Sequence, residues 1–244
     1  MITGYGGRYI GGGLDEVGKP FLFHIASARS ADNKARVALP YPRGVFIKHI
    51  YPDRVEPEKL PLIEYDAIIT DNEAGHGLVS NGRQTPTIAR KFFENPNIHM
   101  FALLRNELHE WGYENDEPNY TPRIAGTIYD RDSGLFLVLG IVAKHPKNWN
   151  KLVSVREIPA ELGKLSYIST YIGEGRDIVL PDLRKVEDFD ALIETIEIKG
   201  KTPQEISDYL FGIMNPDYII CTDVAMWNED SGKWTFGKNN IHEM

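Results

Sequence analysis

The amino-acid sequence predicts an α+β fold built mostly from antiparallel strands. Short apolar or alternating runs, separated by Gly, Pro and Asn, fill much of the first half of the chain and return in the second half. The expected helices are grouped between these runs, whereas a doubly wound sheet would alternate strands with helices. The 244 residues also include 22 glycines and 15 prolines, a composition typical of a fold with many turns.

Strands followed by two helices are expected in the first half. The strands are predicted at residues 21–27, 35–39, 45–50 and 63–70. A helix over 87–94 follows, with Thr85 as its cap and Pro86 in its first turn. A second helix over 98–111 carries apolar residues at helical spacing. These two helices are expected to cover one face of a sheet.

Strands also dominate the second half. They are predicted at residues 123–129 and 135–143, joined by a hairpin turn over 130–134, and at 152–157, 167–172, 218–224 and 234–236. Thr202 and Glu205 form a capping box around Pro203 and open a helix that runs to about Ile213. Because no long linker, repeat or low-complexity tract interrupts the chain, residues 1–244 are expected to form a single domain.

Charge and hydropathy exclude several classes of protein. The formal net charge of −8 disfavours nucleic acid or an anionic membrane as a partner, so any phosphate site would be local. The longest apolar run, 135–143, is far shorter than the roughly 20 residues that span a bilayer. No secretory signal is recognisable at the N-terminus. The single cysteine, Cys221, is expected as a buried, inert thiol within a strand. These features predict a cytoplasmic protein.

The glycine-rich segment 4–13 resembles a dinucleotide-binding loop only superficially. No strand is expected before it, the G-x-G-x-x-G spacing fails, and no helix clearly follows. The favoured interpretation is a strand start or turn that permits close backbone packing.

Two polar segments have the composition of an anion site. Ser27-Ala-Arg-Ser30, followed by Asn33, places hydroxyls, a guanidinium and an amide just past a strand, although a solvated turn would look the same. The segment from Ser80 to Thr85 contains the turn signal Asn81-Gly82 and precedes a helix whose first amides could bind an anion. Composition alone leaves both interpretations open for each segment.

The segment from Tyr113 to Arg123 is the most unusual of the chain. It holds three carboxylates, two amides, two tyrosines and an arginine between an apolar helix and an apolar strand, a place where sites concentrate. Its acids could bind a metal, but no histidine shares the segment at ligand spacing. A single acid in proton transfer is favoured over a metal, and a solvated acidic loop is the structural alternative.

Seven groups of residues carry a resemblance to a known family. They are Gly7-Arg8, Gly18-Lys-Pro-Phe21, Ser27-Ala-Arg-Ser30 with Asn33, Tyr65-Asp66, Val79-Ser-Asn-Gly82 with Thr85, the stretch from Tyr113-Glu114 to Asn119-Tyr-Thr-Pro-Arg-Ile-Ala-Gly126, and Ile168-Ser-Thr-Tyr171. In this order they resemble the archaeal-type inosine monophosphate (IMP) cyclohydrolases. The likeness covers about residues 6–171. Residues 172–244 are expected to extend the same domain, as a further layer on the sheet or as a subunit contact.

The resemblance implies a fold and a reaction. The fold is a four-layer α-β-β-α sandwich like that of N-terminal-nucleophile (Ntn) hydrolases. The reaction is the last step of purine synthesis, in which 5-formamidoimidazole-4-carboxamide ribonucleotide closes its ring and loses water to give inosine 5′-monophosphate. Position 2 is Ile2 rather than Cys, Ser or Thr, which argues against self-processing and amidohydrolase chemistry. A purine nucleotide is the expected partner, no cofactor or metal is required, and a homo-oligomer is compatible with the sequence.

The likeness also assigns roles to residues. Ring closure requires proton transfers, and these fall to Glu114 and Tyr65 without a decision about which of them donates. The residues expected to hold the phosphate, ribose and base are Arg29, Ser30, Asn33, Asn81 and Arg123, with Ser27 and Thr170 as weaker candidates.

The chain departs from the family pattern at Ala28, where serine is usual, and at Lys34, where arginine is common. Two alternatives therefore stay open: a purine-nucleotide-binding paralogue without this catalysis, and an amide hydrolase of the same fold.

Overall fold

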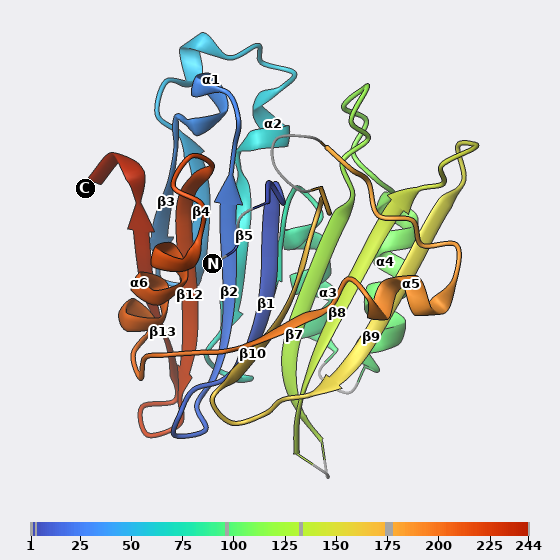
Figure 1. Cartoon of the computed structure of the whole chain (residues 1–244). Coiled ribbons are helices and arrows are strands. Elements are labelled where there is room, and N and C mark those ends of the chain that lie inside the picture. Colours follow the sequence, from blue (N-terminus) through green and yellow to red (C-terminus); the bar gives the residue numbers. More distant parts are fainter. Residues whose placement is uncertain (1, 3, 96–97, 132–133, 174–177, 244) are drawn as a thin grey trace.

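Two antiparallel β-sheets lie against each other in the computed structural model, which describes residues 2, 4–95, 98–131, 134–173 and 178–243 (Figure 1). The described part of one sheet has six strands in the order β11-β10-β1-β2-β12-β13, with bounds β1 (Arg8–Leu14), β2 (Pro20–Ser27), β10 (Lys164–Ser169), β11 (Glu194–Glu197), β12 (Ile219–Asn228) and β13 (Lys233–Asn240). The other has seven in chain order: β3 (Arg36–Tyr41), β4 (Gly44–His49), β5 (Tyr65–Asp71), β6 (His76–Ser80), β7 (Arg123–Arg131), β8 (Gly134–Lys144) and β9 (Lys151–Pro159).

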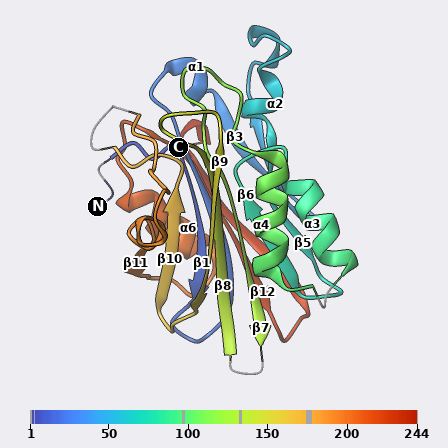
Figure 2. The ribbon, with the colours of Figure 1, turned by 90° about the vertical axis from the view of Figure 1, so that its right-hand side faces the viewer.

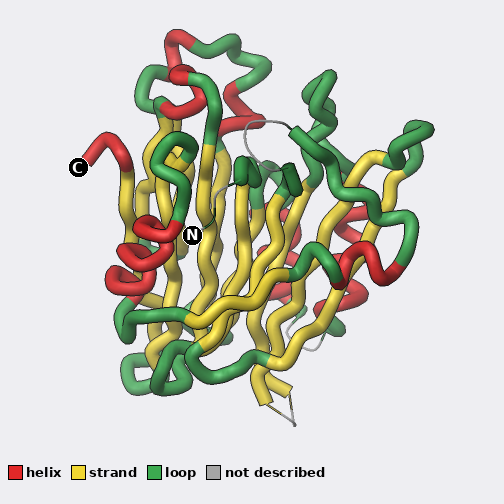
Figure 3. The backbone as a smooth tube through the Cα atoms, in the orientation of Figure 1, coloured by secondary structure: helices red, strands yellow, loops and turns green. Residues whose placement is uncertain are grey.

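Helices pack on the outward faces of both sheets (Figure 2). Helices α3 (Thr85–Glu94) and α4 (Met100–Trp111) cover the seven-stranded sheet, and α6 (Pro203–Ile213) covers β12 and β13 of the six-stranded sheet. The short helices α1 (Ala31–Lys34), α2 (Leu60–Ile63) and α5 (Val186–Asp190) lie in the connections, together with the single 3₁₀ turns Pro52–Arg54 and Ile241–Glu243. More of the described chain lies in strands than in helices (Figure 3).

Three apolar clusters fill the spaces between these elements. In β2, Leu22 faces the other sheet, while Phe21 and Phe23 face α6. Leu104 of α4 packs with Val138 of β8 in the third cluster. Because β2 is covered on both faces, its whole length is buried, which explains its continuous apolar run in the sequence.

The α+β class, the strands and the pair of covering helices are confirmed. The glycine-rich segment leads into β1, as the strand interpretation predicted, and a Cβ atom on Gly13 would lie 2.0 Å from the Lys164 carbonyl oxygen, which demonstrates close backbone packing. The Thr202 side chain accepts a hydrogen bond from the Glu205 amide and caps α6 as predicted. The buried Cys221 lies in β12.

Several boundaries were wrong. Residue Ile63 ends α2 instead of starting a strand, and α4 begins at Met100. Helix α3 begins at Thr85, whose hydroxyl donates to the Gly82 carbonyl (2.6 Å) instead of capping later amides. Strand β10 ends at Ser169 because the Thr170 hydroxyl donates to the Gly6 carbonyl (2.8 Å) and turns the chain. Residues 132–133 of the predicted hairpin turn lie outside the described residues.

The C-terminal part of the chain completes the six-stranded sheet. Strand β12 pairs with β2 on one side and with β13 on the other.

The sequence did not predict the short helices α1, α2 and α5 or strand β11, because segments of four or five residues carry too little periodicity. None of the described helices is long and apolar enough to cross a membrane.

Candidate active site

Charged side chains gather at the end of the two sheets where β1, β5 and β7 start, the upper end in Figure 1. Glu114 and Arg123 are buried there. Arg8 starts β1, Tyr65 starts β5 and Arg123 starts β7, while β2, β6 and β10 end there. Starts and ends alternate along this edge because neighbouring strands run antiparallel. The connection from α4 to β7 brings Glu114 to the same place, where its backbone amide donates to the Thr121 carbonyl (2.8 Å).

Glu114 is the buried carboxyl of this end and is only 1% exposed. Its Oε1 lies 3.5 Å from Arg123 Nη1 and accepts no hydrogen bond from any described residue. Burial raises the pKa of Glu114 to about 7, against the opposing effect of Arg8 and Arg123. A carboxyl with this pKa can donate or accept a proton at neutral pH.

The guanidinium of Arg8 lies close to the acidic groups of the site. Its Nη2 donates to the Leu62 carbonyl (3.1 Å). Burial would lower the pKa of Arg8, but the nearby Glu114, Tyr65 and Tyr171 side chains raise it above its usual value. Arg8 therefore stays charged and acts electrostatically on both Glu114 and Tyr65.

Arg123 is held in place by a hydrogen-bonded chain of amides. Its Nη1 donates to Gln84 Oε1 (2.8 Å), and Gln84 Nε2 donates to Asn81 Oδ1 (3.0 Å). Asn81 in turn donates to the Pro122 carbonyl (2.9 Å) and accepts from the Ile124 amide (2.8 Å). The structure thus brings Asn81 to the site, with its side chain bound to the backbone around Arg123.

Tyr65 is a buried phenol, and its hydroxyl lies 3.1 Å from His24 Nε2. Burial raises the pKa of Tyr65, while the Arg8 and Arg36 charges oppose that shift. Tyr65 therefore carries its proton at neutral pH and, like Glu114, lies beside the Arg8 charge.

Two predicted binding residues support the backbone at this end. The Ser27 hydroxyl donates to the Gly7 carbonyl (2.8 Å), and the Thr170 hydroxyl donates to the Gly6 carbonyl and accepts from the Arg8 amide (3.2 Å). Both side chains are buried. They hold the segment that carries Arg8.

Three other predicted residues lie on the exposed surface at the same end. The Ser30 hydroxyl accepts from the Asn33 amide (3.3 Å) and caps α1. The guanidinium carbon of Arg29 lies 5.0 Å from the centre of the Tyr5 ring, which stacks on Tyr171. The contact of Arg29, Ser30 and Asn33 with a ligand stays a prediction.

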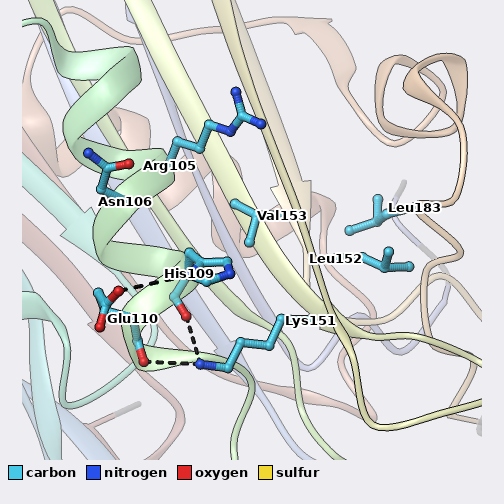
Figure 4. A pocket seen from close by; sticks show the side chains of 8 residues that line it. All are labelled: Arg105, Asn106, His109, Glu110, Lys151, Leu152, Val153 and Leu183. Carbon is cyan, nitrogen blue, oxygen red and sulfur yellow. Dashed lines mark hydrogen bonds and ion pairs between the residues drawn. The ribbon is translucent and has the colours of Figure 1, made fainter.

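A separate hollow of about 530 Å³ lies between α4 and β9 (Figure 4). Its lining includes no residue predicted for the site and consists of Arg105, Asn106, His109, Glu110, Lys151, Leu152, Val153 and Leu183. Lys151 Nζ donates there to the carbonyls of His109 (2.8 Å) and Glu110 (3.2 Å) and so satisfies the end of α4.

Four residues of the site had no predicted role: Arg8, His24, Gln84 and Asp223. His24 and Asp223 could have been found as polar residues in otherwise apolar strands. Burial of a charge or an imidazole is unfavourable, so such residues point to a specific role. Arg8 lies within the glycine-rich segment 4–13, whose composition predicts close backbone packing and gives no sign of a buried cation.

A buried carboxyl with a pKa near 7, a buried phenol and arginines beside them define an acid–base site suited to a small anionic molecule. A family model described as IMP cyclohydrolase-like protein matches residues 5–231, and the chain belongs to this family.

Curated relatives carry the name IMP cyclohydrolase. The relative from Thermococcus kodakarensis is 29% identical over 208 residues, which cover 84% of this chain and 83% of that protein. The relative from Methanocaldococcus jannaschii is 26% identical over 94% of this chain and 96% of its own length. The relative from Methanococcus aeolicus is 31% identical over 93% of this chain and 97% of its own length.

Proposed function

We propose that the protein is an IMP cyclohydrolase, which closes the ring of 5-formamidoimidazole-4-carboxamide ribonucleotide to inosine 5′-monophosphate. The observation that carries the proposal is the convergence of Glu114, Tyr65, Arg8 and Arg123 at one end of the sheets in a member of this family. The buried Cys221, whose thiol pKa is raised by burial, gives no support to a cysteine nucleophile.

The reaction needs orientation and proton transfer. The carboxamide nitrogen bonds to the formyl carbon, and the formyl oxygen leaves as water with one proton from each of the carboxamide and formamido nitrogens. Because both reacting groups belong to one molecule, holding them in contact supplies much of the acceleration. Glu114 and Tyr65 move the protons.

The arginines supply the attraction for the nucleotide. With a net charge of −8, the protein repels anions at long range, so local cations have to bind the phosphate. Arg29, with Ser30 and Asn33 beside it on the surface, is suited to the phosphate ester. Arg123 lies deeper, next to Glu114, and Asn81 is joined to it through Gln84; both are suited to the base and ribose.

The arrangement of layers supports a finer description of the fold. The order α6, six-stranded sheet, seven-stranded sheet, α3 and α4 fits a four-layer α-β-β-α sandwich like that of Ntn hydrolases. The pairing of β12 with β2 supports a single domain over residues 1–244. The reaction belongs to cytoplasmic biosynthesis and needs no cofactor.

Turnover tests the function directly. Purified protein is incubated with the formamido nucleotide, and IMP is followed by absorbance and chromatography. We expect IMP to accumulate in proportion to enzyme and time. Binding of the nucleotide without any IMP in the intact protein would contradict the proposal and favour a binding paralogue.

Gly82→Ala should impair this turnover while leaving the protein folded. The new Cβ would lie 2.9 Å from both Arg123 Nη1 and Gln84 Oε1, and 3.2 Å from Glu114 Oε1. These side-chain ends would shift, and a shift near 1 Å costs about 10²-fold in kcat. Gly212→Ala is the control, since nothing lies within 4 Å of its Cβ position in α6. Steady-state kinetics that show equal kcat for both variants would contradict this placement of Gly82.

A further inference from the structure

A chain of buried polar side chains runs from Tyr65 into the core between the two sheets. His24 Nε2 lies 3.1 Å from the Tyr65 hydroxyl, and His24 Nδ1 lies 3.0 Å from Asp223 Oδ2. His24 and Asp223 are register partners on β2 and β12, and both are 0% exposed. An imidazole and a carboxylate so deep in an apolar core lower stability, so their presence calls for a function.

With Asp223 ionised and His24 neutral, the hydrogen-bonding capacities allow one direction for this chain. An ionised carboxylate only accepts, so neutral His24 carries its hydrogen on Nδ1. His24 Nε2 then accepts from the Tyr65 hydroxyl. The Tyr65 oxygen thus directs its hydrogen toward His24 and keeps lone pairs for another donor.

We propose that His24 and Asp223 are positioning residues that make Tyr65 the proton acceptor in ring closure and leave Glu114 as the donor. The inference rests on the proposed function and assigns the two proton transfers of that same site.

The proton transfers balance over one turnover. As the C–N bond forms, the carboxamide nitrogen gives a proton to the Tyr65 oxygen, the Tyr65 proton passes to His24 Nε2, and the His24 Nδ1 proton passes to Asp223. Glu114 gives its proton to the formyl oxygen. When water is lost, the chain gives one proton through Tyr65 to the leaving hydroxyl, and Glu114 takes one proton from the formamido nitrogen. The chain and Glu114 then carry the same protons as before the reaction.

The surrounding charges favour a proton on Asp223 over an imidazolium. Burial lowers the pKa of His24, and Arg8 and Arg36 lower it further, against the raising effect of Asp223. Burial raises the pKa of Asp223, against the effects of His24 and Lys238. A proton that enters the chain therefore neutralises the buried carboxylate.

Asp223→Asn tests the proposal with little change of shape. The amide can donate to His24 Nδ1, which moves the His24 hydrogen to Nε2 and points it at the Tyr65 oxygen. We expect kcat to fall about 10²- to 10⁴-fold, with KM and the Kd for IMP changed less than about threefold. A kcat unchanged in a protein that turns over the nucleotide would overturn the proposal.

Two further variants separate a relay from a structural role. Combining Asp223→Asn with Tyr65→Phe should cost no more than Tyr65→Phe alone, because Asp223 acts through Tyr65; multiplying losses would overturn the relay. Ser207→Ala is the matched control, since it breaks a buried hydrogen bond to Thr222 (2.6 Å), the neighbour of Asp223. It should lower Tm and leave kcat unchanged.

The tautomer of His24 can be measured without any assay of activity. In the wild-type protein, ¹⁵N NMR should show the His24 hydrogen on Nδ1, and a hydrogen on Nε2 would overturn the proposal even if Asp223→Asn fails to fold. Absence of IMP formation by wild-type protein would instead contradict the proposed function. The two failures are therefore distinguishable.

Discussion

Glu114→Gln is expected to lower kcat for IMP formation about 10²- to 10⁴-fold, the usual contribution of a positioned acid or base. Glutamine preserves the shape of the side chain but cannot give up or take a proton at this position. Because the arginines and the backbone around it are unchanged, KM and the Kd for IMP should change little. Steady-state kinetics and equilibrium binding measure the two quantities separately.

Glu107→Gln is the matched control for this variant. Glu107 is also a buried carboxylate, 6% exposed, and it pairs with Lys91 Nζ (2.5 Å) on the helices outside the seven-stranded sheet. Its replacement should lower the melting temperature and leave kcat as it is. Equal rates for wild type and Glu114→Gln would remove Glu114 from the proton transfers.

The same carboxyl sets a pH dependence of stability. The pKa of Glu114 is about 7 in the folded protein and near its ordinary 4.5 when unfolded, so the folded state binds more protons between these values. The free energy of unfolding should therefore fall by on the order of 3 kcal/mol as pH rises from about 4.5 to about 7. Denaturant unfolding across this range should show a smaller fall in the free energy of unfolding for Glu114→Gln.

Because Glu114 is the proposed proton donor, kcat should decline above pH 7.

Glu114 and Tyr65 could be predicted from the sequence because each stands in a distinctive context. Glu114 lies in a polar segment between an apolar helix and an apolar strand, and both residues match motifs of the family. Their convergence could not be predicted, since β5 and the connection into β7 meet only because both strands flank β6 in one sheet. Arg8, which lies beside both side chains, comes from β1 of the other sheet through the stacking of the two sheets. That stacking depends on which face of each strand is buried.

For Asn81 and Arg29, the sequence alone predicts a position near the site but not the contacts of the side chain. The Asn81-Gly82 turn was recognisable, but only the structure shows that the Asn81 amide binds the Pro122 carbonyl and the Ile124 amide. Arg29 follows a strand that ends at the site, and its exposure reflects the course of the chain into α1. Local turn chemistry is encoded nearby in the sequence, whereas these contacts join segments about 40 residues apart.

Tyr65→Phe is the other variant with a large expected effect. It should lower kcat about 10²- to 10⁴-fold, because the phenol oxygen that takes the proton is gone while the ring keeps its packing. It also leaves His24 Nε2 buried without the hydroxyl, which should lower the free energy of unfolding by about 1 to 3 kcal/mol. Kinetics and denaturant unfolding measure the two effects.

The matched control is Tyr41→Phe, which removes a hydroxyl that donates to Asp66 Oδ1 (2.9 Å), the residue next to Tyr65. Tyr41 lies on β3, on the far side of β4 from Tyr65, so its loss should leave kcat unchanged. Both variants lose one phenolic hydrogen bond to a neighbouring side chain, and only one of them loses the proposed proton acceptor. A wild-type kcat in Tyr65→Phe would exclude Tyr65 from the reaction and with it the chain through His24, whereas an equal loss in both variants would indicate a general effect on the sheet.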